Sequence, residues 1–310
     1  LRRFVRGHSA ALIYSNTITN GHALAALSEM RVPVITHVRE LEGMIQECRE
    51  DGSLAHTLRL TDRYIAVSQA VKDDLIHHCG IADDRIDVVR NFLPDLARYD
   101  MSADASRRRI REMLGLPPDC LMVVGCGTTR PIKGPDFFVA AAANVKRRVD
   151  GHDVCFVWVG GEASGPQFET LMNEAVRRGV AQRVRFLGHR ADYLEFIAAA
   201  DVFVLPSRED PAPLVVLEAG FMGVPTVCFL GAGGAPEFVR DDAGICVANG
   251  DANAMAAAIS KLLESAQLRA ALGSCARDRA RRDHVVSVGA SEVEAIISKV
   301  VTDSQTRLAH

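Results

Sequence analysis

The sequence lacks the features that mark several specialised classes of protein. No apolar run reaches the roughly 18 residues of a membrane-spanning helix, and no secretory signal peptide is evident. The net charge is −3, which argues against nucleic acid as a partner. Because no targeting or spanning segment is evident, we expect a cytoplasmic protein. The abundance of Ala and Arg suggests a bacterial source.

Cysteine is present, but not in the patterns that would give it a role. None of the eight cysteines forms a C-x-x-C pair or stands near a histidine at zinc-ligand spacing. Several lie in apolar runs, as Cys155 does in VCFVWVGG, which is typical of buried thiols in a reducing compartment. A D-x-D metal motif is also missing, because Asp201 and Asp210 are not so spaced. We therefore expect neither a metal nor another cofactor.

Short apolar runs alternate along the chain with longer stretches of helical pattern. The candidate strands are residues 11–14, 33–37, 64–68, 86–90, 121–127, 153–160, 183–188, 202–206, 225–230 and 244–248. These runs are apolar at both odd and even positions, which favours parallel sheets covered by helices on both faces. The fold class is therefore predicted to be α/β, with two doubly wound, Rossmann-like domains.

A polar, turn-rich stretch near residues 93–104 separates the first four candidate strands from the last six. It predicts a first domain over residues 1–103 and a second over 104–284. The final stretch, 285–310, is predicted to be a helix that packs back toward the first domain. The chain opens with Leu1 rather than Met, so we expect a fragment whose first domain lacks its opening strand–helix units.

The stretch VVGCGTTRPIKG, residues 123–134, joins a predicted strand to a predicted helix. Gly125 and Gly127 supply the first half of the dinucleotide pattern G-x-G-x-x-G, but Arg130 stands where the third glycine would be. Free N–H groups in such a turn attract anions, and Lys133 adds a positive charge just before the helix. An ordinary strand–helix turn with an exposed lysine is the alternative interpretation.

A second motif, LPSREDPAPLVVLEAGFMGVPTV, occupies residues 205–227. A strand ends at Pro206, and a charged loop follows at its carboxyl end, where α/β sheets bind ligands. The next helix is predicted to begin near Leu214, so its N–H groups could hold a diphosphate while Asp210 and Glu218 accept hydrogen bonds from sugar hydroxyls. In the alternative, Asp210 is only an N-terminal charge and Glu218 a solvated helix residue.

With these motifs, the chain resembles the retaining glycosyltransferases of the GT-B fold, family 4 (glycosyl transferases group 1). The matching segments follow the family order over about residues 88–265. They are GCGTTRPIKGPDFFVAAA, FVWVGG, VRFLGHRADYLEFIAAADVFVLPSREDPAPLVVLEAGFMGVPTV, GGAPEFV and GICVANGDANAMAAAI. The first domain matches less strongly, through YSNT, PVITHVREL, YIAVSQAVKDDL and VVRNFLP.

The resemblance implies roles for residues around the donor diphosphate and sugar. Lys133 matches the lysine that neutralises the diphosphate, and Glu218 matches the second acid of the E-x7-E motif, which holds the ribose hydroxyls. Asp210 stands where the first acid of that motif usually is and would contact the donor sugar, although the adjacent Glu209 could serve instead. The phosphates would also meet the helix start at Pro213, Leu214 and Val215.

The resemblance also implies a base pocket and a histidine from the first domain. The segment that lines the base pocket matches Leu187, Gly188, His189 and Arg190. His37 matches a histidine that faces the donor sugar across the cleft, with an ordinary core histidine as the alternative. In the turn at Gly127, Thr128 replaces the arginine that the family usually has five residues before the lysine, and Arg130 could supply that charge.

The function implied is transfer of a sugar from a nucleoside-diphosphate sugar to an acceptor hydroxyl, with retention at the anomeric carbon and without a metal. The acceptor would be a carbohydrate or a lipid-linked molecule. A lipid-linked acceptor would bring a peripheral membrane contact, although no strongly basic amphipathic helix supports one. Two alternatives remain at this point: a nucleotide-binding remnant without turnover and an NAD-dependent oxidoreductase.

Overall fold

The computed structural model describes residues 10–93, 96–99 and 101–309. Contacts between Cα atoms divide the chain into two compact units, which are described separately below. The first unit is Leu1–Asn91 with Val286–His310, and the second is Phe92–Val285. The domain boundaries expected from the sequence stay predictions. None of the described helices is both long and apolar enough to cross a membrane.

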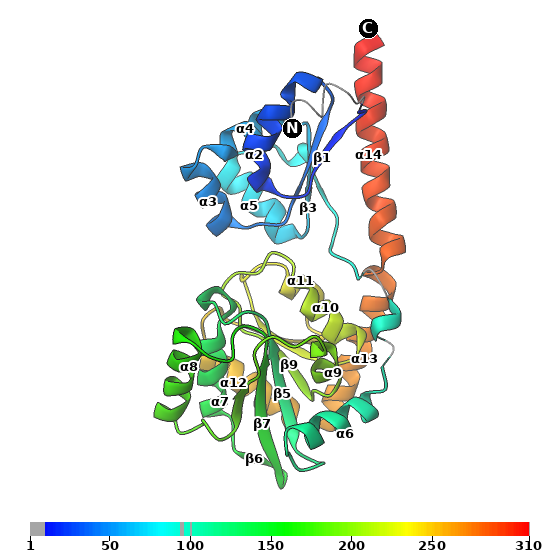
Figure 1. The fold of residues 1–310 in the computed structure, drawn as a ribbon. Coiled ribbons are helices and arrows are strands. Elements are labelled where there is room, and N and C mark those ends of the chain that lie inside the picture. Colours follow the sequence, from blue (N-terminus) through cyan, green and yellow to red (C-terminus); the bar gives the residue numbers. More distant parts are fainter. Residues whose placement is uncertain (1–9, 94–95, 100, 310) are drawn as a thin grey trace. The chain divides into compact units, whose positions relative to one another are not determined.

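The first unit contains a parallel sheet with helices beside it (Figure 1), and the strands of the sheet follow their order in the sequence. The strands are β1 (Ile13–Ser15), β2 (Val34–Val38), β3 (Arg63–Ala66) and β4 (Ile86–Val88). The helices beside the sheet are α2 (Gly21–Leu27), α3 (Glu42–Glu50), α4 (Ser53–Leu60), α5 (Gln69–Cys79) and α14 (Val286–Ala309). Helix α14 covers the sheet because its apolar residues, among them Val293 and Ile297, pack on Ile35, Ile65 and Val89.

The second unit contains a larger sheet, in which six parallel strands lie in the order β8-β7-β5-β9-β10-β11. Their bounds are β5 (Leu121–Cys126), β7 (His152–Val159), β8 (Val184–Phe186), β9 (Val202–Leu205), β10 (Thr226–Phe229) and β11 (Gly244–Val247). Counted along the chain this is the order 3-2-1-4-5-6 of doubly wound nucleotide-binding sheets, which confirms the predicted fold class. The strand order reverses between β5 and β9, so the point where such sheets bind ligands lies at the carboxyl ends of these two strands.

A short antiparallel strand, β6 (Arg148–Val149), joins the edge of this sheet and is absent from the sequence prediction. It pairs with the start of β7 through a turn at Asp150 and Gly151, both of which have positive φ angles. A two-residue strand has no periodic pattern, so apolar alternation could not have revealed it.

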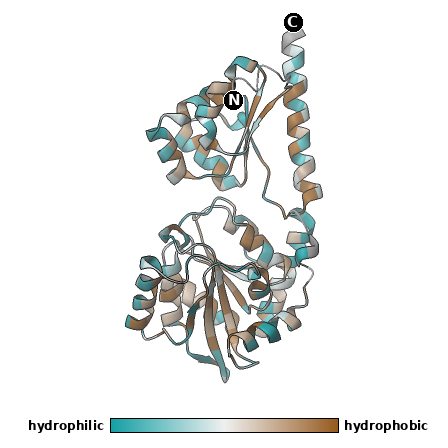
Figure 2. Cartoon of the chain, in the orientation of Figure 1, coloured by the Kyte–Doolittle hydropathy of each residue, from teal (hydrophilic) through white to brown (hydrophobic). Residues whose placement is uncertain are grey.

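Helices cover both faces of the second sheet, so the strands carry apolar residues on both sides (Figure 2). Met122 and Val124 of β5 belong to the core under one set of helices, whereas Leu121 and Val123 belong to the other core. The first set is α6 (Ala103–Met113), α9 (Tyr193–Ala198), α10 (Leu214–Phe221), α11 (Ala235–Val239) and α13 (Ala266–Asp283). The second set is α7 (Pro135–Asn144), α8 (Pro166–Arg177) and α12 (Ala252–Leu263).

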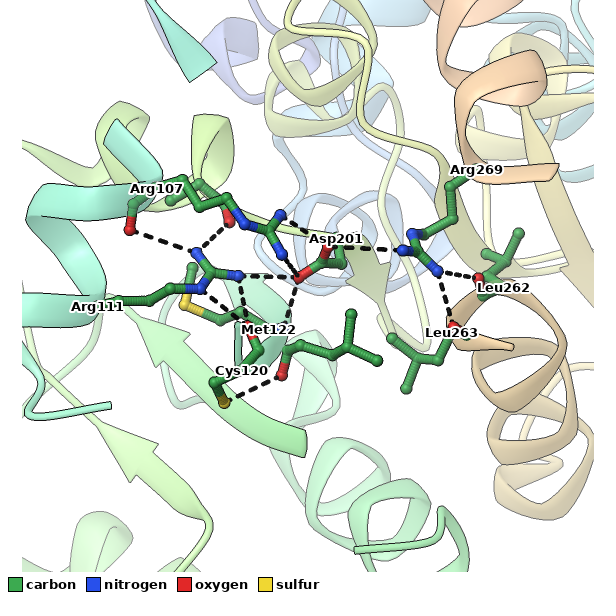
Figure 3. Close-up of polar contacts among 10 residues, drawn as sticks. Arg107, Arg111, Cys120, Met122, Asp201, Leu262, Leu263 and Arg269 are labelled. Carbon is green, nitrogen blue, oxygen red and sulfur yellow. Dashed lines mark hydrogen bonds and ion pairs between the residues drawn. The ribbon is translucent and has the colours of Figure 1, made fainter. Parts of the chain in front are cut away.

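Asp201, just before β9, is the centre of a buried ionic cluster at the amino end of that strand (Figure 3). Its carboxylate lies 2.8 Å from a guanidinium nitrogen of Arg107 and 3.0 Å from a guanidinium nitrogen of Arg111. The carboxylate also accepts a hydrogen bond from the main-chain N–H of Met122 at 2.7 Å. Arg269 of α13 approaches to 3.9 Å. We call Asp201 with Arg107, Arg111 and Arg269 the arginine cluster. It fastens α6 and α13 to the sheet at the edge remote from the switch point.

Candidate functional site

Glycine residues allow the strands to approach closely at the carboxyl ends of β5 and β7. Gly160 has a φ of +113°, and a Cβ there would lie 2.4 Å from the carbonyl oxygen of Gly127. The N–H of Gly160 donates to the carbonyl of Gly188 at 2.8 Å, and the indole N–H of the buried Trp158 donates to the carbonyl of Gly127 at 3.0 Å. We call Gly127, Gly160 and Gly188 the glycine edge. It lets the main chains that follow β5, β7 and β8 pack closely against one another at the carboxyl end of the sheet.

The turn that follows β5 carries Lys133 at the end of a 3-10 turn, Pro131–Lys133, directly before α7. Gly134 then adopts a φ of +69°, and a Cβ at this position would lie 1.9 Å from the carbonyl oxygen of Pro206. The close packing of Gly134 against Pro206 therefore fixes where the main chain of Lys133 lies. The Nζ of Lys133 lies 2.6 Å from Oδ2 of Asp210. Thr128 and Arg130 of the same turn are exposed.

Arg208 fastens this turn to the loop that follows β9. Its main-chain N–H donates to the carbonyl of Ile132 at 2.8 Å, and its guanidinium donates to the carbonyl of Pro131 at 2.6 Å. The same guanidinium holds both carboxylate oxygens of Asp136, at 2.8 and 2.6 Å, and stacks 4.2 Å from the Phe137 ring centre. Bidentate contacts of this kind fix orientation as well as position.

The loop after β9 places Asp210 beside the lysine and then leads into α10. The N–H of Asp210 donates to the carbonyl of Ala232 at 2.7 Å, which buries the aspartate against the loop that follows β10. Glu209 is half-buried, and α10 begins at Leu214 after Pro213. Among the described side chains none caps this helix, so its first turn is suited to an anion.

Glu218 lies on α10, and its residue is only 4% exposed. Its Oε1 accepts hydrogen bonds from the hydroxyl of Tyr193 at 2.8 Å and from that of Tyr99 at 3.3 Å. Its Oε2 is buried and has no hydrogen-bond partner among the described residues. Burial raises the pKa of this carboxyl above its ordinary value, against the hydrogen bonds of the two tyrosines. Within the described part of the loop after β9, the buried Oγ of Ser207 likewise has no partner.

The structure places the predicted base segment next to the glycine edge. The N–H of Leu187 donates to the carbonyl of Trp158 at 3.0 Å, and Gly188 is buried, whereas His189 is exposed. Arg190 donates to both carboxylate oxygens of Asp192 at 2.8 Å and lies over the Phe196 ring. The Arg190 side chain is thus engaged locally.

His37 belongs to the first unit, on β2, whereas the other predicted site residues belong to the second. It is 3% exposed, and its Nδ1 shares a 2.6 Å hydrogen bond with the Tyr14 hydroxyl. Its Nε2 is buried without a partner among the residues described. Burial, with a smaller contribution from Arg39, lowers the pKa of His37 to about 4. The imidazole is therefore neutral at pH 7.

One group of described residues in the first unit has the composition of a metal site. Glu42, Asp74 and His78 bring one ligand atom each within 4.8 Å of one another in the first unit. His78 Nδ1 lies 2.6 Å from Asp74 Oδ1, so hydrogen bonding already explains this arrangement. The expectation of a metal-free site stays a prediction.

Sequence reasoning missed several residues that the structure brings to the site. Ser207 and Arg208 stood in the motif itself, at the carboxyl end of a predicted strand, so their position could have drawn attention to them. Trp158, Tyr193 and Tyr99 could not have been found in this way. Their contacts join segments distant in sequence, and no spacing rule predicts such contacts.

A 3-2-1-4-5-6 sheet with a lysine, a helix start without a described side-chain cap and a buried carboxylate at its switch point is typical of doubly wound α/β proteins that bind phosphate-bearing ligands. The family described as "Glycosyl transferases group 1" matches residues 119–265, and "Glycosyltransferase Family 4" matches residues 1–95. The chain belongs to this glycosyltransferase family.

Curated relatives and solved structures agree with this membership. The D-inositol 3-phosphate glycosyltransferase of Corynebacterium efficiens is 32% identical over 234 residues, which are 74% of this chain and 54% of that protein. The chain thus spans about half the length of this relative. HepE of Anabaena, solved in complex with UDP, is 26% identical, with a TM-score of 0.85 over 96% of this chain and 81% of that one. A second HepE structure contains UDP-glucose and has a TM-score of 0.84 at 25% identity, over 96% of this chain and 81% of that one.

Proposed function

We propose that the second unit binds a nucleoside-diphosphate sugar and that the protein transfers the sugar to an acceptor hydroxyl, with retention and without a metal ion. One observation carries the proposal. Lys133 and the uncapped start of α10 lie at the switch point of the sheet, followed one turn later by a buried Glu218 whose Oε2 lacks a partner among the described residues. A diphosphate would accept hydrogen bonds from Lys133 and from the start of α10, and a sugar hydroxyl would donate one to Oε2 of Glu218.

Lys133 and the helix start would act on the leaving group. When the bond between the anomeric carbon and the phosphate oxygen breaks, negative charge develops on the departing diphosphate. Lys133 and the first N–H groups of α10 are fixed donors that stabilise this charge. Attack by the acceptor hydroxyl from the face that the diphosphate leaves retains configuration, and the departing phosphate oxygen takes the hydroxyl proton. Asp210, held beside Lys133, would contact the donor sugar.

Glu218 and the segment 187–190 would hold the nucleoside. The Oε2 of Glu218, which has no partner among the described residues, would accept hydrogen bonds from the ribose hydroxyls, while the backbone at Leu187 and Gly188 would border the base. We take UDP as the first candidate nucleotide because HepE, which has the same fold at 26% identity, is solved with UDP. The base remains for experiment to assign.

The acceptor proposed is a carbohydrate or a lipid-linked molecule, and the names of the curated relatives suggest D-inositol 3-phosphate as the first one to assay. His37 would face the donor sugar from the first unit. Its pKa of about 4 keeps the ring neutral, so it would exchange hydrogen bonds with sugar hydroxyls rather than supply charge.

Thermal stabilisation by UDP, GDP, ADP and NAD tests this function, with wild type beside Lys133→Ala and Glu218→Ala. A ligand at 100 times its Kd stabilises the folded protein by about 2.7 kcal/mol. We expect one nucleoside diphosphate to raise the melting temperature and both variants to lose that shift. Mass spectrometry of the sugar product follows with the matching donor.

Other outcomes identify the alternatives. Stabilisation by NAD alone would favour an oxidoreductase, although Arg130 stands where the third glycine of a dinucleotide site would be. Binding of a nucleoside diphosphate without sugar release or transfer would indicate a nucleotide-binding remnant. Stabilisation by none of the four would refute the proposed donor site.

A further inference from the structure

The two oxygens of the Glu218 carboxylate differ sharply in their surroundings. Oε1 accepts two hydroxyl hydrogen bonds, from Tyr193 at 2.8 Å and Tyr99 at 3.3 Å. Oε2 is buried and accepts none from the residues that the structure describes. A buried acceptor without a partner is costly, and most buried polar atoms in proteins have one.

The two tyrosines reach Glu218 from different segments, which fixes the carboxylate in space. Tyr193 is the first residue of α9, and Tyr99 ends a 3-10 turn, Leu96–Tyr99. The Tyr99 ring also lies 5.4 Å from the ring of Phe221, on the same helix as Glu218. With Oε1 held by two donors, the carboxylate cannot rotate to present Oε1 to a ligand without losing both bonds. Oε2 is therefore the atom left for it.

We propose that Tyr193, supported by Tyr99, is a positioning residue that holds Glu218 by Oε1 and so directs Oε2 toward the ribose hydroxyls of the nucleotide. The inference rests on the proposed nucleotide-sugar function. It adds a specific claim, which is that the Tyr193 hydroxyl contributes to affinity only through the ribose. Tyr193 makes no contribution through the base or the diphosphate.

A pair of ligands separates this role from a general structural one. Isothermal titration calorimetry measures the affinity of wild type and of Tyr193→Phe for two ligands. These are UDP and 2′,3′-dideoxyuridine diphosphate, which lacks both ribose hydroxyls. The change deletes one hydroxyl and keeps the ring. We expect affinity for UDP to fall about five- to tenfold, as for the loss of one ordinary hydrogen bond. Affinity for the dideoxy nucleotide should change less than about twofold.

A second set of variants tests the route through Glu218. In a Glu218→Gln background, Tyr193→Phe should produce no further loss of UDP affinity, because the group on which it acts is already changed. Tyr99→Phe should weaken UDP selectively but less than Tyr193→Phe, in keeping with its longer hydrogen bond. This second tyrosine keeps the test decisive if Tyr193→Phe folds poorly.

Three results would overturn the inference. Equal weakening of UDP and the dideoxy nucleotide would show that Tyr193 shapes the pocket generally. An unchanged UDP affinity in both tyrosine variants would show that neither positions the carboxylate. A wild-type protein that binds neither nucleotide would remove the donor site and this inference together, and it would be recognised before any variant is compared.

Discussion

The buried carboxylates near the two ends of strand β9 differ in how many of their oxygens are hydrogen-bonded. At the amino end, both oxygens of Asp201 are engaged, by Arg107, Arg111 and the N–H of Met122 (Figure 3). Beyond the carboxyl end, Glu218 has one oxygen held and the other without a partner among the described residues. Both side chains are almost fully buried, so exposure does not explain the difference.

The difference separates a group that supports the fold from one kept for a ligand. Buried polar atoms are normally satisfied because an unsatisfied one costs folding free energy. The arginine cluster follows that rule and binds α6 and α13 to the sheet. Glu218 and Ser207 depart from it, and they do so at the end of the sheet where the fold positions ligands. Changes at the two ends should therefore have different consequences.

The largest effect should follow from breaking the arginine cluster. Asp201→Asn leaves the fully buried Arg111 without its carboxylate partner, so we expect the free energy of unfolding to fall by about 3–5 kcal/mol. Denaturant unfolding measures the loss. The matched control is Glu174→Gln, which breaks a more exposed pair with Arg178 and should cost no more than about 1 kcal/mol. Similar losses in the two variants would contradict the structural role given to Asp201.

A smaller effect should follow from loosening the turn that carries Lys133. Arg208→Ala removes the bidentate bond to Asp136 and the contact with Pro131, while Lys133 itself is kept. We expect nucleoside-diphosphate affinity to fall about tenfold, near 1.4 kcal/mol, with little loss of stability. Arg208→Lys should not restore the affinity, because an ammonium group cannot hold both carboxylate oxygens in the same plane. The exposed Arg177→Ala serves as the control, and an equal loss there would count against the positioning of the turn.

The smallest effect should appear in the pH dependence of stability at Glu218. Burial raises its pKa above the ordinary 4.5, so the folded protein binds this proton more tightly than the unfolded chain. The stabilising contribution is complete below the unfolded pKa and is lost as pH rises through the folded pKa. Glutamine does not ionise, so we expect Glu218→Gln to have a higher melting temperature than wild type at about pH 8. The difference between the two melting temperatures should become smaller toward about pH 4. A variant that is less stable than wild type at both pH values would contradict this expectation.

Much of the fold could be read from the sequence because apolar runs and turn residues determine it locally. The run predicted at 121–127 is the strand Leu121–Cys126, and the helix predicted near Leu214 begins at that residue. The short strand β6 escaped prediction because two residues carry no pattern. The prediction of a doubly wound sheet was confirmed because its central strands β5, β7, β9 and β10 carry apolar residues on both faces.

The candidate site could be predicted only in part. Lys133, Asp210 and Glu218 stand in motifs that follow strand ends, where doubly wound sheets bind ligands, so their position indicated a role. The bond from Tyr99 to Glu218 joins residues 119 positions apart, and no periodicity encodes such a contact. The lack of a partner for Oε2 among the described residues likewise depends on packing in three dimensions. Neither feature can be read from the spacing of residues along the chain.

Trp158 is the single tryptophan of the chain, and it lies under the glycine edge with its indole N–H bonded to Gly127. All tryptophan emission of the protein therefore arises at one known position beside the proposed donor site. A change in that emission on adding a nucleotide would report on this position directly, without an attached label. Trp158 can therefore serve as an intrinsic fluorescent probe of the proposed site in the unmodified protein.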